Sequence, residues 1–178
     1  MVWIHGFGTG DNKEIFSVAS MKKMLIQVET RNYNNIIEWN SWIPQKINIF
    51  GWKLLQDRLP TKDNLAKRNI QMDLNTCYLC NSENETADHL FTSCFTTAII
   101  SQSISGCCKI PPIYAFSVHD LFEVHRYVNN NDKRKRLIQS IILTACWTIW
   151  FARNKVCFEN ESVKINKIIG DIKSLSFL

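Results

Sequence analysis

The sequence of 178 residues lacks any long hydrophobic run. Its most apolar stretch, residues 138–149, is interrupted by Gln139, Ser140 and Thr144. A helix that spans a membrane needs about 20 consecutive apolar residues, so the composition excludes such a helix and predicts no membrane partner. The apolar fraction of 46% and the six tryptophans predict instead a globular chain of one domain or two small ones.

A secretory signal is also missing from the sequence, and the number of cysteines, seven, is odd. Proteins that fold in oxidising compartments normally pair their cysteines as disulfides. We therefore expect an intracellular protein, in the nucleus or the cytoplasm, and not a secreted one.

No constellation of catalytic residues is apparent. His5, His119 and His125 lie in separate segments without a nucleophile or carboxylates around them, and each is interpreted as a surface or capping histidine. The glycine repeat Gly6-x-Gly8-x-Gly10 has the wrong spacing for a dinucleotide-binding fingerprint, and no helix opens on it. An enzyme is the least expected class, and no small-molecule substrate is predicted.

Cysteine and histidine gather instead in one segment with the pattern Cys-x2-Cys-x8-His-x4-Cys. The residues are Cys77, Cys80, His89 and Cys94. Three thiolates and an imidazole complete the tetrahedral shell of one Zn²⁺ ion and leave no position for water, so the predicted zinc is structural, with one ion per chain. Ordinary free cysteines, or a disulfide, are the alternatives.

Local signals place these four ligands on a turn and a helix. Asn81 and Ser82 favour a tight turn after the first pair, and Thr86 can cap a helix that follows. Residues five apart on an α-helix are separated by about 140°, so His89 and Cys94 cannot share one regular face. We expect His89 in an irregular first turn and Cys94 further inside the helix.

Charge is distributed unevenly along the chain. Residues 41–72 carry six basic residues and two acids, whereas residues 73–98 carry four acids and no Lys or Arg. Basic patches beside aromatic side chains can hold nucleic-acid phosphates and bases, although a solvated helix face has the same composition. The candidate phosphate contacts are Lys46, Lys53, Arg58, Lys62, Lys67 and Arg68, and the candidate stacking residues are Trp52 and Tyr78.

Periodicity predicts a mainly α fold: a small helical domain with a zinc knuckle and a short N-terminal β ribbon. The predicted domains are a β/turn segment at 1–38, a zinc-binding domain at 39–105 and a helical region at 106–178. Helices are expected from Pro44 to before Arg58, from Lys62 to about Arg68 after a Thr61 cap, from Val118 to about Val128 after a Ser117 cap, from about Lys133 to Phe158, and after a Ser162 cap. The segment 106–112 is expected to be a loop, and the helix over 133–158 to form the core.

A series of short motifs along the chain resembles the reverse transcriptase zinc-binding domain of plant non-LTR (LINE-type) retrotransposon polyproteins. They are, in order, Trp42-x-Pro44-x-Lys46, Phe50-x-Trp52, Arg58-Leu59-Pro60-Thr61, the Cys77/Cys80 pair, Glu85-Thr86-x2-His89-Leu90-Phe91-x2-Cys94 and, downstream, Trp147-x2-Trp150-x2-Arg153-Asn154. The resemblance covers most of the chain and joins the metal ligands to a separate helix-and-turn motif.

The resemblance implies a zinc module that accompanies a polymerase, with RNA or DNA and upstream reverse transcriptase domains as its partners. This chain has no Asp-Asp dipeptide of the kind that binds polymerase metals, and no set of four acids for a ribonuclease H site. We expect a non-enzymatic, nucleic-acid-binding piece of an element-encoded protein. The competing hypothesis is a zinc-stabilised structural or protein-interaction domain, in which the basic residues pair internally.

Overall fold

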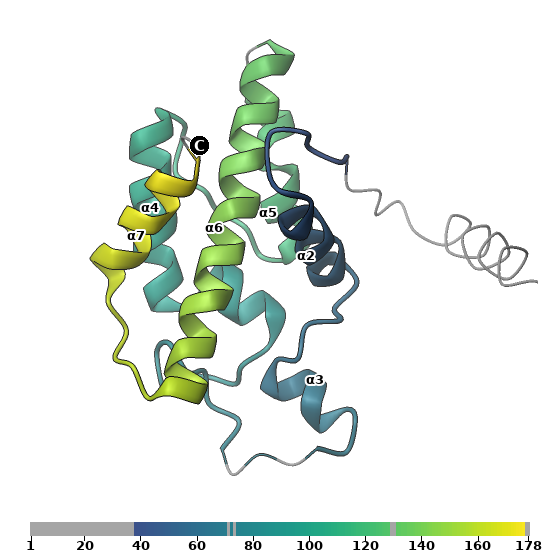
Figure 1. Ribbon diagram of the computed structural model, residues 1–178, viewed down its shortest axis with the longest axis vertical. Coiled ribbons are helices and arrows are strands. Elements are labelled where there is room, and N and C mark those ends of the chain that lie inside the picture. Colours follow the sequence, from purple (N-terminus) through teal and green to yellow (C-terminus); the bar gives the residue numbers. More distant parts are fainter. Residues whose placement is uncertain (1–37, 71, 73, 129–130, 177–178) are drawn as a thin grey trace, which may run out of the picture. The chain divides into compact units, whose positions relative to one another are not determined.

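The computed structural model describes residues 38–70, 72, 74–128 and 131–176. All of them belong to one compact unit. This part of the chain is helical, and it contains no strand (Figure 1). The elements are α2 (Gln45–Leu55), α3 (Lys62–Ala66), the π-helical turn η1 (His89–Ser93), α4 (Phe95–Cys108), α5 (Val118–Glu123), the 3-10 turn η2 (Val124–Tyr127), α6 (Asp132–Glu159) and α7 (Ile165–Ser176). The mainly α prediction is confirmed, while the predicted β ribbon lies outside the described residues.

Helix α6 is the central element, as its sequence predicts. It begins after Asn131, whose side chain accepts a hydrogen bond from the Arg134 amide (3.1 Å), and it ends at Asn160, which adopts the left-handed conformation. Figure 1 shows α4 and α7 on one side of α6 and α2 and α5 on the other, and α6 contacts α2, α5 and α7. The long helix therefore connects the two sides of the unit.

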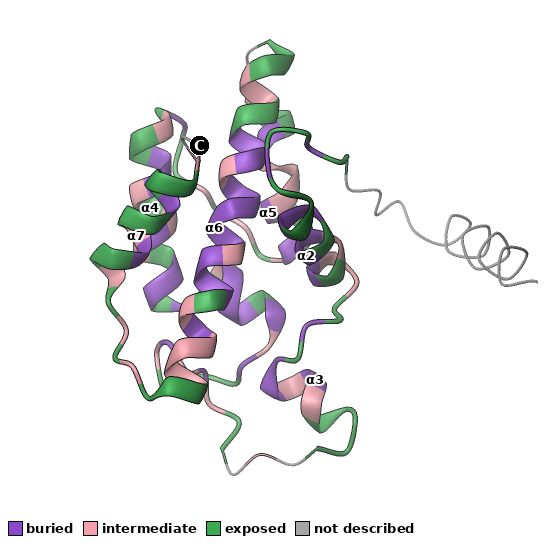
Figure 2. Cartoon of the chain, viewed as in Figure 1, coloured by how far each residue is buried: buried purple, intermediate pink, exposed green. Residues whose placement is uncertain are grey.

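The hydrophobic core surrounds α6, and the buried faces of the helices turn toward it (Figure 2). Phe50 of α2 packs edge-on against Trp147 of α6, with ring centroids 5.4 Å apart, and against Phe91 at 6.3 Å. Trp150 is buried in this core, as predicted, whereas Trp147 is half-buried. Each large apolar side chain buried in this way contributes about 1.5–3 kcal/mol to folding.

The loop predicted at 106–112 is wrong in its first half, because α4 continues through Cys108. Ile104 and Ser105 are buried, so the packed face of the helix extends to its last turn. The helix then closes through Lys109, which has a φ of 52°, and the amide of buried Ile110 donates to the Ser105 carbonyl (3.1 Å). The predicted domain boundary at 105 falls inside α4.

Other element boundaries shift by a few residues. Thr61 and Ser117 cap α3 and α5 as predicted, and Ser117 forms a capping box with Asp120. The predicted cap at Ser162 is wrong, since α7 begins only at Ile165. His119 is exposed, whereas His125 is buried and its Nδ1 lies 2.7 Å from the Phe122 carbonyl at the end of α5, which fits a capping role.

Within the described ranges no helix combines the length and the hydropathy that a membrane crossing requires.

Candidate metal centre

The first two candidate ligands lie on a tight turn closed by backbone hydrogen bonds. An antiparallel bridge pairs Thr76 with Asn84, and the Cys77 amide donates to the Glu83 carbonyl (2.7 Å). Asn81 adopts a φ of 55°, and its amide donates to the Cys77 carbonyl (2.8 Å). The predicted turn at Asn81 is confirmed, and it directs both cysteine sulfurs to one side.

The second two ligands lie at the junction of η1 and α4. The Thr86 hydroxyl accepts a hydrogen bond from the His89 amide (3.0 Å), so Thr86 caps this turn as predicted. The prediction that Cys94 lies further inside the helix is wrong. Cys94 has extended backbone dihedrals and forms the N-cap of α4.

A wide turn resolves the geometric conflict between His89 and Cys94. The Cys94 amide donates to the His89 carbonyl (2.8 Å), a hydrogen bond that spans five residues and characterises a π turn. This turn, followed by the extended backbone of Cys94, brings the two side chains to a common point.

All four sequence-predicted ligands meet in one place. Their ligand atoms all lie within 4.8 Å of one another, with 4.0 Å between the sulfurs of Cys77 and Cys94 and 3.3 Å between Cys80 Sγ and His89 Nε2. Metal–ligand bonds of about 2.0–2.3 Å in a tetrahedron require separations of about 3.3–3.8 Å between ligand atoms. The Cys80–His89 separation lies in this range and the Cys77–Cys94 separation slightly exceeds it, so the donor set fits one tetrahedral metal ion after small shifts of the side chains.

Burial makes this candidate site a closed one. Cys77 and Cys94 are inaccessible to solvent, His89 is 7% exposed and Cys80 is half-buried. Four protein ligands complete a tetrahedral shell, so a metal bound here has no position for a water or a substrate. The arrangement supports a structural role for the metal and not hydrolysis.

The thiols of Cys77 and Cys94 shift each other's pKa in opposite directions. A hydrogen bond from the Cys77 thiol, helped by the backbone amides of Thr97 and Thr96, lowers the pKa of Cys94 to about 5 against the opposing effect of burial. The same pairing, together with burial, raises the pKa of Cys77. The pair thus favours one negative charge in the absence of a cation, and a divalent metal would displace the remaining proton.

The histidine is oriented by contacts on the side of its ring away from the cysteines. Its Nδ1 lies 3.3 Å from Ser93 Oγ and 3.4 Å from a carboxylate oxygen of Glu83. A proton on Nδ1 can be donated to these groups, which leaves the Nε2 lone pair for the metal. Such contacts fix the tautomer and the ring orientation of metal-binding histidines.

A buried ion pair behind the turn was missed by the sequence analysis. Glu85 is fully buried and Arg153 of α6 is 2% exposed. Arg153 Nε donates to both Glu85 oxygens (3.1 and 3.2 Å), Arg153 Nη2 donates to Oε1, and Glu85 also accepts from the amides of Lys62 (3.2 Å) and Tyr78 (3.3 Å). Both residues belong to motifs noted above, but their pairing across 68 residues depends on the fold.

Two of the candidate nucleic-acid contacts, Lys62 and Tyr78, interact with the Glu85–Arg153 pair. Lys62 is buried, its Nζ donates to the Thr76 carbonyl (2.6 Å), and it lies 3.5 Å from the Tyr78 ring centroid. The guanidinium of Arg153 lies 4.9 Å from the same ring. Buried Lys62 and half-buried Tyr78 therefore both contact the groups that support the turn.

The other candidate nucleic-acid contacts differ in how many hydrogen bonds, ion pairs and ring contacts they make within the protein. Lys67 forms ion pairs with Asp57 (3.3 Å) and Asp63 (2.8 Å), and Arg68 donates to the Arg58 carbonyl (3.4 Å). Arg58 lies over the ring of half-buried Trp52 at 5.1 Å. Exposed Lys46 lies 5.7 Å from the Trp147 ring, and Lys53 is exposed on α2.

Comparison with known proteins gives a class for the segment that carries the metal centre. Residues 16–100 match the model of a protein family described as zinc-binding in reverse transcriptase. All four ligands lie within this match, so the matched segment supports a reverse transcriptase zinc-binding domain, in agreement with the resemblance seen in the sequence. No curated protein and no solved structure matches the chain. Arg153 lies 53 residues beyond the end of the matched segment.

Proposed function

We propose that this chain is a zinc-binding module of the type found in plant non-LTR (LINE-type) retrotransposon polyproteins, with one structural Zn²⁺ per chain. It would help a reverse transcriptase bind RNA or DNA and would have no polymerase activity of its own. The observation that carries the proposal is the closed set of three cysteines and one histidine inside a segment similar to that family.

The choice of zinc follows from the donor set. Thiolates and imidazole in a tetrahedral arrangement suit Zn²⁺, whereas Mg²⁺ and Ca²⁺ prefer six or more oxygen ligands. Iron bound by cysteines in an intracellular protein normally belongs to a cluster held by four sulfur ligands, and here the fourth ligand is His89.

The exposed side of α2 is the surface best suited to nucleic acid. We define the α2 face as Trp39, Trp42, Lys46, Lys53 and Arg58. Residues 39–56 contain no acid, and the tryptophans at 39 and 42 are 60% and 50% exposed. Two 3.0 Å hydrogen bonds join Asn40 to Asn48 of α2, and they hold the segment that carries Trp39 and Trp42 beside this helix. Exposed aromatic rings next to cations are the usual means of binding single strands.

Charge reversal on this face tests the nucleic-acid role. The double variant Lys46→Glu/Lys53→Glu should weaken binding to a single-stranded RNA by about 10-fold or more, and should reduce the slope of log K against log salt by about 1.4, since each phosphate contact contributes about 0.7. Fluorescence anisotropy over a salt series measures both quantities. The matched control Lys164→Glu/Lys167→Glu changes exposed lysines at and before the start of α7 and should have a much smaller effect.

The second candidate is a zinc-stabilised structural or protein-interaction domain, including a decayed copy of such an element. It is supported by the internal engagement of Lys62, Lys67 and Tyr78. Absence of RNA and DNA binding at low salt, with zinc bound and the fold intact, would favour this candidate. Equal loss of RNA binding in the α2 variant and in the α7 control would remove the α2 face from the first proposal.

A further inference from the structure

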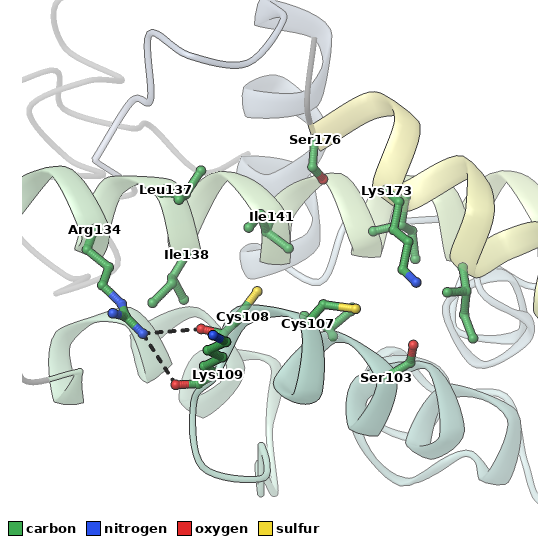
Figure 3. A pocket seen from close by; sticks show the side chains of 13 residues that line it. Ser103, Cys107, Cys108, Lys109, Arg134, Leu137, Ile138, Ile141, Lys173 and Ser176 are labelled. Atoms are coloured by element: carbon green, nitrogen blue, oxygen red, sulfur yellow. Dashed lines mark hydrogen bonds between the residues drawn. The ribbon is translucent and has the colours of Figure 1, made fainter.

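An apolar cavity lies between α4, α6 and α7, on the other side of α6 from α2. Its volume is about 330 Å³, and its walls come from all three helices. Figure 3 shows Ile138 of α6 pointing toward Cys108 of α4, with Lys173 extending from α7, and Leu137 and Ile141 of α6 also line the cavity. The metal ligands, the α2 face and the Glu85–Arg153 pair contribute no residue to this cavity.

The size and lining of the cavity suit a small molecule. Ligand pockets in proteins typically measure about 300–1,000 Å³ and have mostly apolar walls with a few polar groups. The α6 wall runs from Arg134 to Ile141, two helical turns, which at about 1.5 Å per residue is about 10 Å. An extended hydrocarbon chain of about eight to ten carbons has this length.

The charged groups at the cavity are all positive. Lys109, Arg134 and Lys173 line it, and among the described residues none that lines it is Asp or Glu. Arg134 is already engaged, because its Nη2 donates to the carbonyls of Cys108 (3.2 Å) and Lys109 (3.3 Å) at the end of α4, as Figure 3 shows. The side chains of Lys173 and Lys109 have no recorded hydrogen bond or ion pair with residues of the described ranges, and Figure 3 shows Lys173 extending from α7, so its ammonium group is placed to meet an anion.

We propose that this cavity binds a single-chain amphiphilic anion, such as a medium-chain carboxylate, with its hydrocarbon chain between α4, α6 and α7 and its anionic group at Lys173. Burial of the chain supplies affinity in proportion to the apolar area removed from water. The lysine selects the sign of the head group, because a cationic head would face three positive charges and no acid. This site is independent of the proposed zinc and nucleic-acid functions.

Binding of decanoate to the zinc-loaded protein, measured by calorimetry, tests the proposal. A dissociation constant of about 100 µM is expected for a ligand of this size. Decanol and decyltrimethylammonium should bind about 10-fold or more weakly. The variant Lys173→Glu should lose about 10-fold in affinity for decanoate, whereas Lys167→Glu, an exposed lysine on the same helix that does not line the cavity, should lose less than about 2-fold.

Thiol labelling gives an independent test of where the ligand sits. Cys107 is exposed and lines the cavity, whereas half-buried Cys157 does not line it. Saturating decanoate should slow alkylation of Cys107 by about 10-fold and leave the rate at Cys157 within about 2-fold, read by mass spectrometry of the peptides.

Three results would overturn the proposal. The first is no binding of decanoate, and the second is equal binding of decanoate, decanol and the cationic amphiphile. The third is a ligand-free protein that is dimeric in sedimentation and becomes monomeric in the cavity-filling variant Ile141→Trp, since a second copy would then occupy this surface.

Discussion

The knuckle segment, residues 74–88, and the helices α4, α6 and α7 are held in place by different means. The knuckle segment is almost without helix, has one isolated bridge, and buries few apolar side chains. It has only a few points of attachment: two of the four candidate metal ligands, and the hydrogen bonds of Glu85 to Arg153. The three helices instead share a continuous apolar interface, with Ile100, Ile138 and Ile168 buried in the core.

The difference indicates what a metal bound at the candidate site would contribute to the knuckle segment. A short segment with little apolar surface cannot offset the conformational entropy lost when it becomes ordered, so metals or disulfides commonly supply the missing stability. Distributed packing tolerates the loss of one contact better than point attachments do. The two modes of stabilisation should therefore respond differently when a single attachment is removed.

Removal of the metal should release the knuckle segment and leave the three helices largely folded. After chelation, the amides of Cys77 and Asn81, now bonded to carbonyls within the turn, should exchange about 100-fold faster or more. Amides in the middle of α6 and in α7 should retain most of their protection. Hydrogen exchange read by mass spectrometry checks this, and unchanged exchange in the knuckle segment would contradict it.

Loss of Arg153 should be the most damaging change outside the metal site. The variant Arg153→Met leaves the Glu85 carboxylate buried without its cation, at a cost of about 3–5 kcal/mol in the free energy of unfolding. Adding Glu85→Gln should recover at least about half of this loss, because the charge is removed as well. Urea unfolding measures both values.

The matched control for Arg153 is Arg126→Met, which breaks the exposed pair between Arg126 and Glu123 and should cost less than about 1 kcal/mol. If Arg153→Met were as mild as this control, the buried pair would have no special role in holding the knuckle segment against α6.

Truncation on the packed side should weaken the fold without affecting the metal. Ile168 of α7 is 4% exposed, and Ile168→Ala should cost about 2–3 kcal/mol. Leu175 on the same helix is 43% exposed, so Leu175→Ala should cost less than about 1 kcal/mol. Both variants should retain the metal content of the wild type, and metal loss in the folded Ile168 variant would show that the two regions are not separable.

Among the main variants, the smallest effect is expected at the N-cap of α5. Ser117→Ala removes the side chain that accepts from the Asp120 amide (3.2 Å) and should cost about 1 kcal/mol. Ser174→Ala, at an exposed position of α7, should change the unfolding midpoint little. A loss well above 2 kcal/mol for Ser117→Ala would mean that α5 contributes more to the core than its cap indicates.

The sequence predicts the features that depend on local pattern. Spacing alone identifies the four candidate ligands that the structure brings together, and periodicity identifies α6 almost to its ends, because caps and apolar stripes act within a few residues. Cys94 and the end of α4 were misplaced because a π turn and the burial of Ile110 depend on packing against distant residues. The pairing of Glu85 with Arg153, and the burial of Lys62 beside it, likewise require the whole unit to fold.

The most direct test of the central claim is the zinc content of the purified protein. About one zinc per chain is predicted for the wild type and for Cys107→Ser, which lies outside the site, with almost none in Cys77→Ser and Cys94→Ser. A wild-type protein that is folded and free of zinc, or variants at Cys77 and Cys94 that keep their zinc, would contradict this account of what holds the knuckle segment together.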